Sequence, residues 1–87
     1  MITKLEKYGA VYCMPCKAID KTLNELKQTM PIEIVKFDAD EDEEHFDDMN
    51  IRSVPTLIFY NENGEEVRRT TGNKTLQQII DIINDRN

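Results

Sequence analysis

Within its first 37 residues the chain shows a strand pattern, then a helix pattern, then a second strand pattern. Residues 2–11 form the weaker strand pattern, whose apolar members are Ile2, Leu5, Tyr8 and Val11. Over residues 15–30 apolar side chains recur at steps of four, three and four, which predicts an amphipathic helix whose buried stripe is Ile19, Leu23, Leu26 and Met30. Residues 32–37 are rich in β-branched side chains and predict a strand covered on both faces. A strand, a helix and a strand of these lengths imply a parallel pair joined by a right-handed crossover.

A short helix and a buried strand are expected in the middle of the chain. The helix is expected to have Asp40 as its N-cap, with Glu43 as the reciprocal capping partner, and to bury Phe46 and Met49. Residues 56–60 are continuously apolar. Such a run predicts a central strand that is buried on both faces.

A hairpin and a capped helix are expected to complete the chain. Residues 61–64 form the turn, whose closing glycine supplies a positive φ, and the polar residues 66–71 form an edge strand. The last helix begins with Thr75 and Gln78 at capping-box spacing, and its apolar stripe consists of Leu76, Ile79, Ile80 and Ile83. The predicted order is therefore β-α-β-α-β-β-α, in one domain that spans residues 1–87.

The balance of charge limits what the protein can bind. Its 87 residues include 11 lysines and arginines against 17 aspartates and glutamates, which gives a formal net charge of -6. Nucleic acids and anionic membranes both require a cationic face, which an acidic protein does not offer. The N-terminal segment interleaves charged and apolar side chains, so we expect neither a signal peptide nor a membrane span there. We therefore expect a cytoplasmic protein that binds neither nucleic acid nor membranes.

Cys13 and Cys16 are the only 2 cysteines, and their CxxC spacing places them where the first strand meets the first helix. Pro15 between them suits the first turn of a helix, where a missing N–H costs nothing. The N-terminus of a helix stabilises a thiolate, so Cys13 is the candidate nucleophile. Cys16, one turn later, can attack the mixed disulfide that Cys13 forms with a substrate. In a reducing compartment so short a loop is seldom a structural disulfide.

Metal binding and inert burial are the alternatives for these motifs. A structural zinc site needs four ligands, whereas one CxxC and the single histidine, His45, supply three. Two ordinary buried cysteines fit poorly with a proline between them that marks a helix start. The acidic segment at residues 38–42 begins like a calcium loop, but Glu43 and Met49 stand where that loop needs a glycine and a bidentate glutamate. We expect no metal and no cofactor, and we assign His45 no role.

The chain resembles the thioredoxin-like family, in particular a short thioredoxin or a glutaredoxin-sized member. The resemblance is carried by Cys13-Met14-Pro15-Cys16, by Val54-Pro55-Thr56 and by the order of the elements. It implies an α/β fold with a mixed four-stranded sheet flanked by helices. It also implies that Pro55 is a cis proline facing the cysteines, that the backbone of Val54 is free to pair with an extended substrate, and that Gly72 lines the same surface. The expected docking patch consists of Tyr12, Met14, Val54, Pro55 and Gly72.

Three positions depart from the pattern of the thioredoxins that the chain resembles. Tyr12 stands where a tryptophan is usual, and Met14 replaces the glycine of their CGPC. Lys7 falls where those proteins carry a buried aspartate that helps to move the proton of the second cysteine. The candidates for that task in this chain are Lys36, Asp38 or water.

The resemblance and the cysteine pair together predict a thiol–disulfide oxidoreductase that reduces disulfides in protein substrates. Cys13 attacks the substrate, Cys16 resolves the mixed disulfide, and a thioredoxin reductase-like partner restores the dithiol of what we expect to be a monomer. One alternative is a glutaredoxin-like enzyme recharged by glutathione, although only Gly72 stands where such enzymes usually have a glycine pair. Another is a non-catalytic binding or metal-carrying domain with the same fold.

Overall fold

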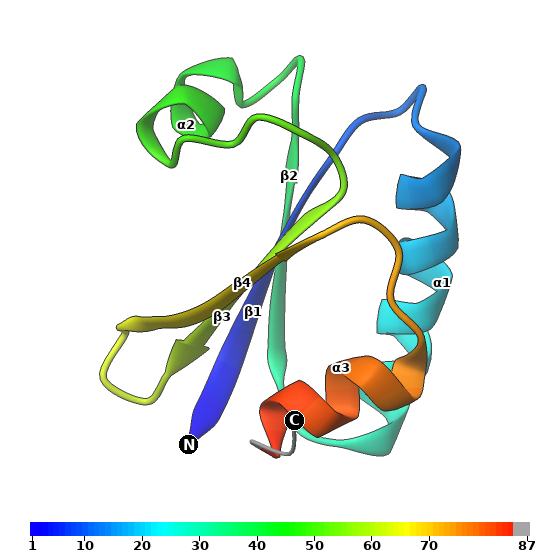
Figure 1. Cartoon of the computed structure of the whole chain (residues 1–87), viewed down its shortest axis with the longest axis vertical. Coiled ribbons are helices and arrows are strands. Elements are labelled where there is room, and N and C mark those ends of the chain that lie inside the picture. The colour runs from blue at the N-terminus through cyan, green and yellow to red at the C-terminus, as the bar shows by residue number, and fades with distance from the viewer. Residues whose placement is uncertain (85–87) are drawn as a thin grey trace.

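The computed structural model describes residues 1–84, and its helices and strands follow the predicted order. The elements are β1 (Ile2–Gly9), α1 (Met14–Thr29), β2 (Glu33–Asp38), α2 (Glu43–Asp48), β3 (Thr56–Asn61), β4 (Glu66–Thr71) and α3 (Leu76–Ile83). Figure 1 shows how the chain passes through them. The β-α-β-α-β-β-α order predicted from the sequence is confirmed.

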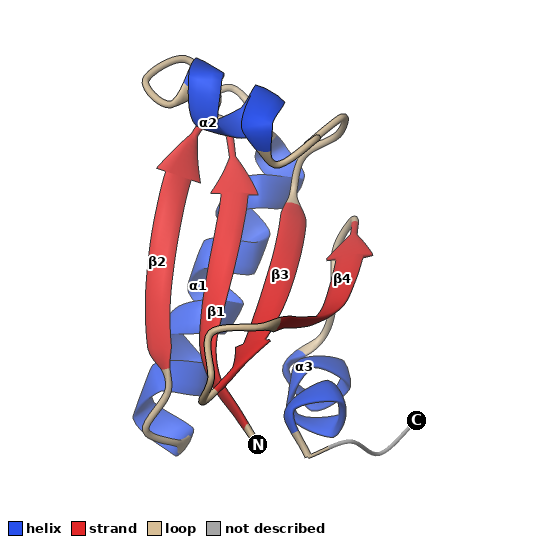
Figure 2. Cartoon of the chain, turned by 90° about the vertical axis from the view of Figure 1, so that its left-hand side faces the viewer, coloured by secondary structure: helices blue, strands red, loops and turns tan. Residues whose placement is uncertain are grey.

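The four strands form one mixed sheet in the order β2-β1-β3-β4 (Figure 2). β1 pairs with β2 in parallel, as the predicted crossover through α1 requires. β1 pairs with β3 and β3 with β4 in antiparallel fashion. Helices α1 and α3 lie on one side of this sheet, and α2 lies at one end of the other side (Figure 1).

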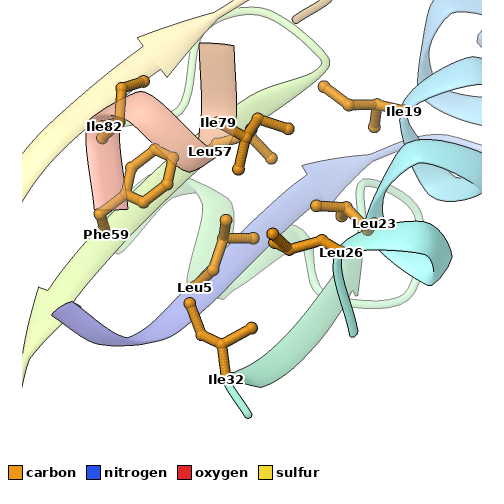
Figure 3. Packing of buried hydrophobic residues seen from close by; sticks show 9 residues of the cluster. All are labelled: Leu5, Ile19, Leu23, Leu26, Ile32, Leu57, Phe59, Ile79 and Ile82. Atoms are coloured by element: carbon orange, nitrogen blue, oxygen red, sulfur yellow. The ribbon is translucent and has the colours of Figure 1, made fainter. Parts of the chain in front are cut away.

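The main core lies between the sheet and helices α1 and α3. Because successive residues of a strand face opposite sides, Leu57 and Phe59 of β3 point into this core while Ile58 and Tyr60 point away. The core side chains, shown in Figure 3, are Leu5, Ile19, Leu23, Leu26, Ile32, Leu57, Phe59, Ile79 and Ile82. Burial of residues 56–60 on both faces, as the sequence predicts, follows from the interior position of β3.

The opposite face of the sheet combines aromatic packing with a buried polar network. Tyr8 of β1 packs against Phe46 of α2 and lies in one cluster with Tyr60 of β3. Glu6 Oε1 accepts hydrogen bonds from the hydroxyl groups of Tyr8 (2.8 Å) and Tyr60 (2.7 Å). The hydroxyl of Tyr8 also lies 3.0 Å from Nε2 of His45. This network therefore links β1, β3 and α2.

The structure corrects the extent of the first strand and shows where the second one lies. The first strand ends at Gly9, and Val11, assigned to it on its apolar character, lies in a turn with 70% of its surface exposed. The second strand, β2, contacts neighbours on both faces as predicted, because Ile34 packs against the main core and Phe37 against the aromatic cluster. It lies at the edge of the sheet, and none of its residues is fully buried.

The prediction for the start of α2 is also wrong, whereas that for α3 is confirmed. The N-cap of α2 is Asp42, and its side chain makes no capping hydrogen bond. The carboxylate of Asp38 instead accepts from the backbone N–H groups of Asp40 (3.0 Å) and Glu41 (3.2 Å). At α3 the capping box of Thr75 and Gln78 is present in both directions.

Candidate active site

A tight turn connects β1 to α1 and places Cys13 at the helix N-terminus. The backbone N–H of Cys13 donates to the carbonyl of Ala10 (3.1 Å), which closes the turn. Cys13 is the N-cap residue of α1, with the extended backbone that N-caps adopt (φ -96°, ψ 109°). Pro15 lies in the first helical turn, as predicted. The sequence thus ends the strand and starts the helix within a few residues, with the cysteines at the junction.

The two cysteines form a disulfide, and their Cα atoms lie 5.2 Å apart. Cys13 Sγ accepts a hydrogen bond from the backbone N–H of Cys16 (3.2 Å), so the sulfur takes the role of the usual N-cap oxygen. Cys13 is 9% exposed and Cys16 only 1% exposed. No acidic side chain lies in the first turn of α1. A thiolate on Cys13 is therefore stabilised by the helix N-terminus, while Cys16 lies beneath it, shielded from substrates.

The loop before β3 packs against the cysteine pair. Val54 and Ala39 contact the small cluster formed by Ala10, Cys13 and Cys16. The Val54–Pro55 peptide bond is cis. The carbonyl of Pro55 accepts a hydrogen bond from the backbone N–H of Gly72 (2.9 Å), whose φ of +81° favours glycine. The loop before β3 thus contacts the cysteine pair through Val54, and the hydrogen bond from Gly72 to Pro55 joins it to the residue that follows β4.

The expected docking residues differ in what they offer to a partner. Tyr12 and Met14 project into solvent, with 71% and 70% of their surfaces exposed. The side chain of Pro55 is fully buried, so this residue shapes the surface but contributes little contact area. The sequence analysis missed Val11, whose exposed apolar side chain precedes Tyr12 in the same turn. Its position two residues before Cys13 was the signal that could have identified it.

Lys7 is buried near the redox pair and forms an ion pair that the sequence analysis did not foresee. Its Nζ lies 3.0 Å from Oδ1 of Asp20, and Nζ of Lys36 lies 3.3 Å from the same oxygen. Asp20 was missed, because its position one helical turn after Cys16 is informative only once the strand that faces α1 is known. Two residues were candidates for moving the proton of Cys16. Lys36 forms an ion pair with Asp20, and Asp38 accepts backbone hydrogen bonds in the loop before α2.

Among residues 1–84, no group of three or more His, Cys, Asp or Glu side chains is arranged to hold a metal ion. Within the same residues, no helix has the length and apolar character needed to cross a membrane.

Comparison with known proteins gives consistent matches. A family model described as Thioredoxin matches residues 3–85. The chain is 35% identical over 82 residues to the thioredoxin of Bacillus subtilis (strain 168), covering 92% of this chain and 78% of that one. It superposes on a mutant thioredoxin from Halobacterium salinarum NRC-1 with a TM-score of 0.88 at 26% identity, covering 94% and 72% of the two chains. The reduced thioredoxin pre-protein of Schistosoma mansoni gives a TM-score of 0.85 at 32% identity, covering 94% and 76%.

Proposed function

The chain belongs to the thioredoxin family and is a thiol–disulfide oxidoreductase, and we propose that Cys13 is its nucleophile and Cys16 its resolving cysteine. One observation carries this assignment of roles. Cys13 Sγ is the N-cap group of α1 and accepts from the N–H of Cys16, whereas Cys16 is 1% exposed. The accessible sulfur at the positive end of a helix is the better nucleophile, and the buried one can react only within the protein.

The proposed reaction consists of two thiol–disulfide exchanges. The Cys13 thiolate attacks one sulfur of a substrate disulfide, the substrate S–S bond breaks, and the departing sulfur takes up a proton. Cys16 then loses its proton and attacks Cys13 Sγ. The mixed disulfide breaks, the Cys13–Cys16 disulfide forms, and the second substrate sulfur leaves as a thiol. A reductase-type partner returns two electrons and two protons to restore the dithiol.

Substrate docking is the second part of the proposal. Tyr12, Met14 and Val54 supply apolar side chains around Cys13, and Pro55 and Gly72 shape the adjacent backbone. An exposed apolar patch beside a reactive group is typical of protein–protein contact. We expect extended segments of partly folded proteins to bind there through the backbone of Val54.

The setting of the reaction completes the proposal. Disulfide-containing substrates and a reductase-type partner follow from the family, and the specific reductant proposed is a thioredoxin reductase-like enzyme. We assign the function to a monomer that forms one domain over residues 1–87 and works in the cytoplasm. A reducing compartment suits a protein that must be returned to its dithiol form after each turnover.

Serine variants of the two cysteines test the assignment of roles. Cys13→Ser should abolish reduction of insulin disulfides, whereas Cys16→Ser should retain the first attack and accumulate mixed disulfides that mass spectrometry detects. Asn24→Ser, on the exposed side of α1, is the matched control and should behave as the wild type. Full insulin-reducing activity in Cys13→Ser would sink the proposal. Faster recharging by glutathione than by a thioredoxin reductase would overturn the choice of reductant.

A further inference from the structure

A buried lysine lies near the cysteine pair and has no part in the two exchanges described above. Lys7 is 7% exposed. A Cβ atom on Gly9 would lie 2.6 Å from Nζ of Lys7 and 3.3 Å from Cβ of Cys16. The ammonium group and the resolving cysteine therefore both lie close to the same point beside this glycine, which makes them neighbours. Burying an ammonium is costly, so its position needs a compensating interaction or a purpose.

Asp20 provides the compensation and fixes where the ammonium points. Asp20 follows Cys16 by one turn of α1, so both residues lie on the same side of the helix. Lys7 extends from β1 toward this side and meets Asp20 Oδ1 at 3.0 Å. The carboxylate is 36% exposed and also binds the half-exposed Lys36. One end of the pair is thus anchored near solvent while the ammonium stays beside Cys16.

A groove connects this ion pair to solvent. Its volume is about 480 Å³, and Lys7 is part of its lining. The other charged groups that face it come from α1, from β2 and from the loop before α2: Lys17, Asp20, Lys36, Asp38, Glu41 and Asp42. Cys16 does not line the groove, but Lys7 does, so water in the groove can reach the ammonium group that lies near Cys16.

We propose that Lys7, anchored by Asp20, is a positioning residue that stabilises the thiolate of Cys16 in the resolving step. Cys16–SH loses its proton to water in the groove, and the resulting thiolate lies beside the Lys7 ammonium. The thiolate then attacks Cys13 Sγ, the bond from Cys13 to the substrate sulfur breaks, and that sulfur takes up a proton from solvent. Lys7 has only donor hydrogens and acts through its charge. Water is therefore the proton acceptor, and a cation takes the place of an acidic side chain.

The test compares variants that change the local charge in opposite directions. Lys7→Met removes the cation, and Asp20→Asn removes the anion that partly neutralises it. Lys27→Met, on the exposed side of α1, makes the same charge change as Lys7→Met far along the helix and is the control. The first readout is the equilibrium between the dithiol and the disulfide in glutathione buffers. The second is the pH profile of the resolving step, followed by release of a coloured aromatic thiolate from a mixed disulfide on Cys13.

Opposite shifts are expected from the two variants. Lys7→Met should move the equilibrium about tenfold toward the disulfide, which is about 30 mV for a two-electron couple, and should displace the rise of the resolving rate to higher pH. Asp20→Asn should move both quantities the other way. Lys27→Met should match the wild type. If the ion pair between Lys7 and Asp20 were merely structural, both substitutions would lower the urea midpoint, and they would not shift the glutathione equilibrium in opposite directions.

Two outcomes overturn the inference. One is an equilibrium in Lys7→Met that matches Lys27→Met, and the other is a shift of the same sign in Lys7→Met and Asp20→Asn. Where Lys7→Met does not fold, Asp20→Asn decides alone, since an absent or reversed shift contradicts the role. The inference rests on the proposed roles of Cys13 and Cys16. The glutathione equilibrium can nevertheless be measured in a protein that reduces no protein substrate, so failure of one proposal is distinguishable from failure of the other.

Discussion

Gly9 is the residue at which the sheet and the redox pair come closest. A Cβ atom on Gly9 would lie 2.6 Å from Nζ of Lys7 and 3.3 Å from Cβ of Cys16, which leaves no room for a side chain. Its φ is not in the left-handed region, so steric room and not backbone conformation calls for glycine here. Any larger residue at this position must displace Lys7 or push α1 away from β1.

Gly9→Ala is expected to destabilise the protein through this contact. The added methyl group overpacks a buried site, which costs about 1–3 kcal/mol. Most of that cost should disappear in the Lys7→Ala background, because the atoms within 3 Å of the new methyl group are Nζ and Cε of Lys7. A double-mutant cycle from urea unfolding of the disulfide form measures this coupling. Additive effects of Gly9→Ala and Lys7→Ala would show that the methyl group is resisted by Cys16 of α1 instead.

For single residues, the sequence predicted which side chains form the candidate site better than it predicted which side chains contact one another. The positions of Cys13 and Cys16 followed from the CxxC spacing and Pro15, because helix-start chemistry is local. The contact between Lys7 and Asp20 did not follow, since it joins β1 to α1 and depends on how the helix packs on the sheet. Asp20 carried no motif of its own. A charged residue one helical turn after a reactive cysteine becomes informative only once the facing strand is known.

At the level of elements, α1 and α2 begin in different ways. The N-cap of α1 is the sulfur of Cys13, so the group that stabilises the helix is also the reactive atom. Helix α2 has only six residues and no side-chain cap, and the loop before it is held by Asp38 and Asp42. The side chain of Asp42 accepts from the backbone N–H of Asp38 (2.8 Å). The acidic segment is therefore a network of side-chain-to-backbone hydrogen bonds.

Asp38→Ala is expected to lower the free energy of unfolding by about 1 kcal/mol, as for the loss of a helix cap. Its carboxylate accepts two backbone N–H groups in the loop that leads to α2. Asp40→Ala removes the same charge from an exposed side chain and should change stability by less than about 0.5 kcal/mol. Urea unfolding of both variants makes the comparison. A larger loss in Asp40→Ala would restore the capping role that the sequence pattern predicted for that residue.

The sequence predicted the type of each element more reliably than its place in the sheet. Residues 56–60 were correctly expected to be central, because a continuously apolar run must be buried on both faces. For residues 32–37 the β-branched pattern predicted a strand but not its place in the sheet, and residues 33–37 lie in the edge strand β2. The order of strands depends on which pairs meet after the chain collapses. That long-range choice leaves no local signature in a segment of six residues.

Across the whole molecule, the two faces of the sheet are covered unequally. Helices α1 and α3 pack over one face, whereas α2 covers one end of the other (Figures 1 and 2). On that second face, Glu6 and Tyr60 are 8% exposed although no described helix other than α2 lies there. The side chain of Lys4 covers them, with Nζ 3.5 Å from Glu6 Oε2 and 4.6 Å from the centre of the Tyr60 ring. A hydrogen-bonded polar network thus closes part of this face.

This network makes the stability of the whole molecule sensitive to alkaline pH. Burial first, and then the hydrogen bond to Glu6, raise the pKa of Tyr8 and the pKa of Tyr60 far above their ordinary value of 10.0. In the unfolded chain both tyrosines ionise from about pH 10, whereas the folded protein keeps them protonated. The free energy of unfolding should therefore be unaffected by these groups below about pH 10. Above it, each tyrosine should lower stability by up to about 1.4 kcal/mol per pH unit.

The Tyr8→Phe variant separates the effect of tyrosine ionisation on stability from other effects of alkaline pH. At about pH 8 it should cost about 1.5–3 kcal/mol, because it removes a buried hydrogen bond to a carboxylate. Above about pH 10 its stability should fall less steeply than that of the wild type, since one of the two linked protons is gone. Urea unfolding of the disulfide form keeps the cysteines out of the titration. Tyr12→Phe makes the same substitution at a residue that is 71% exposed and is the control. Equal alkaline slopes in Tyr8→Phe and the wild type would contradict the assignment.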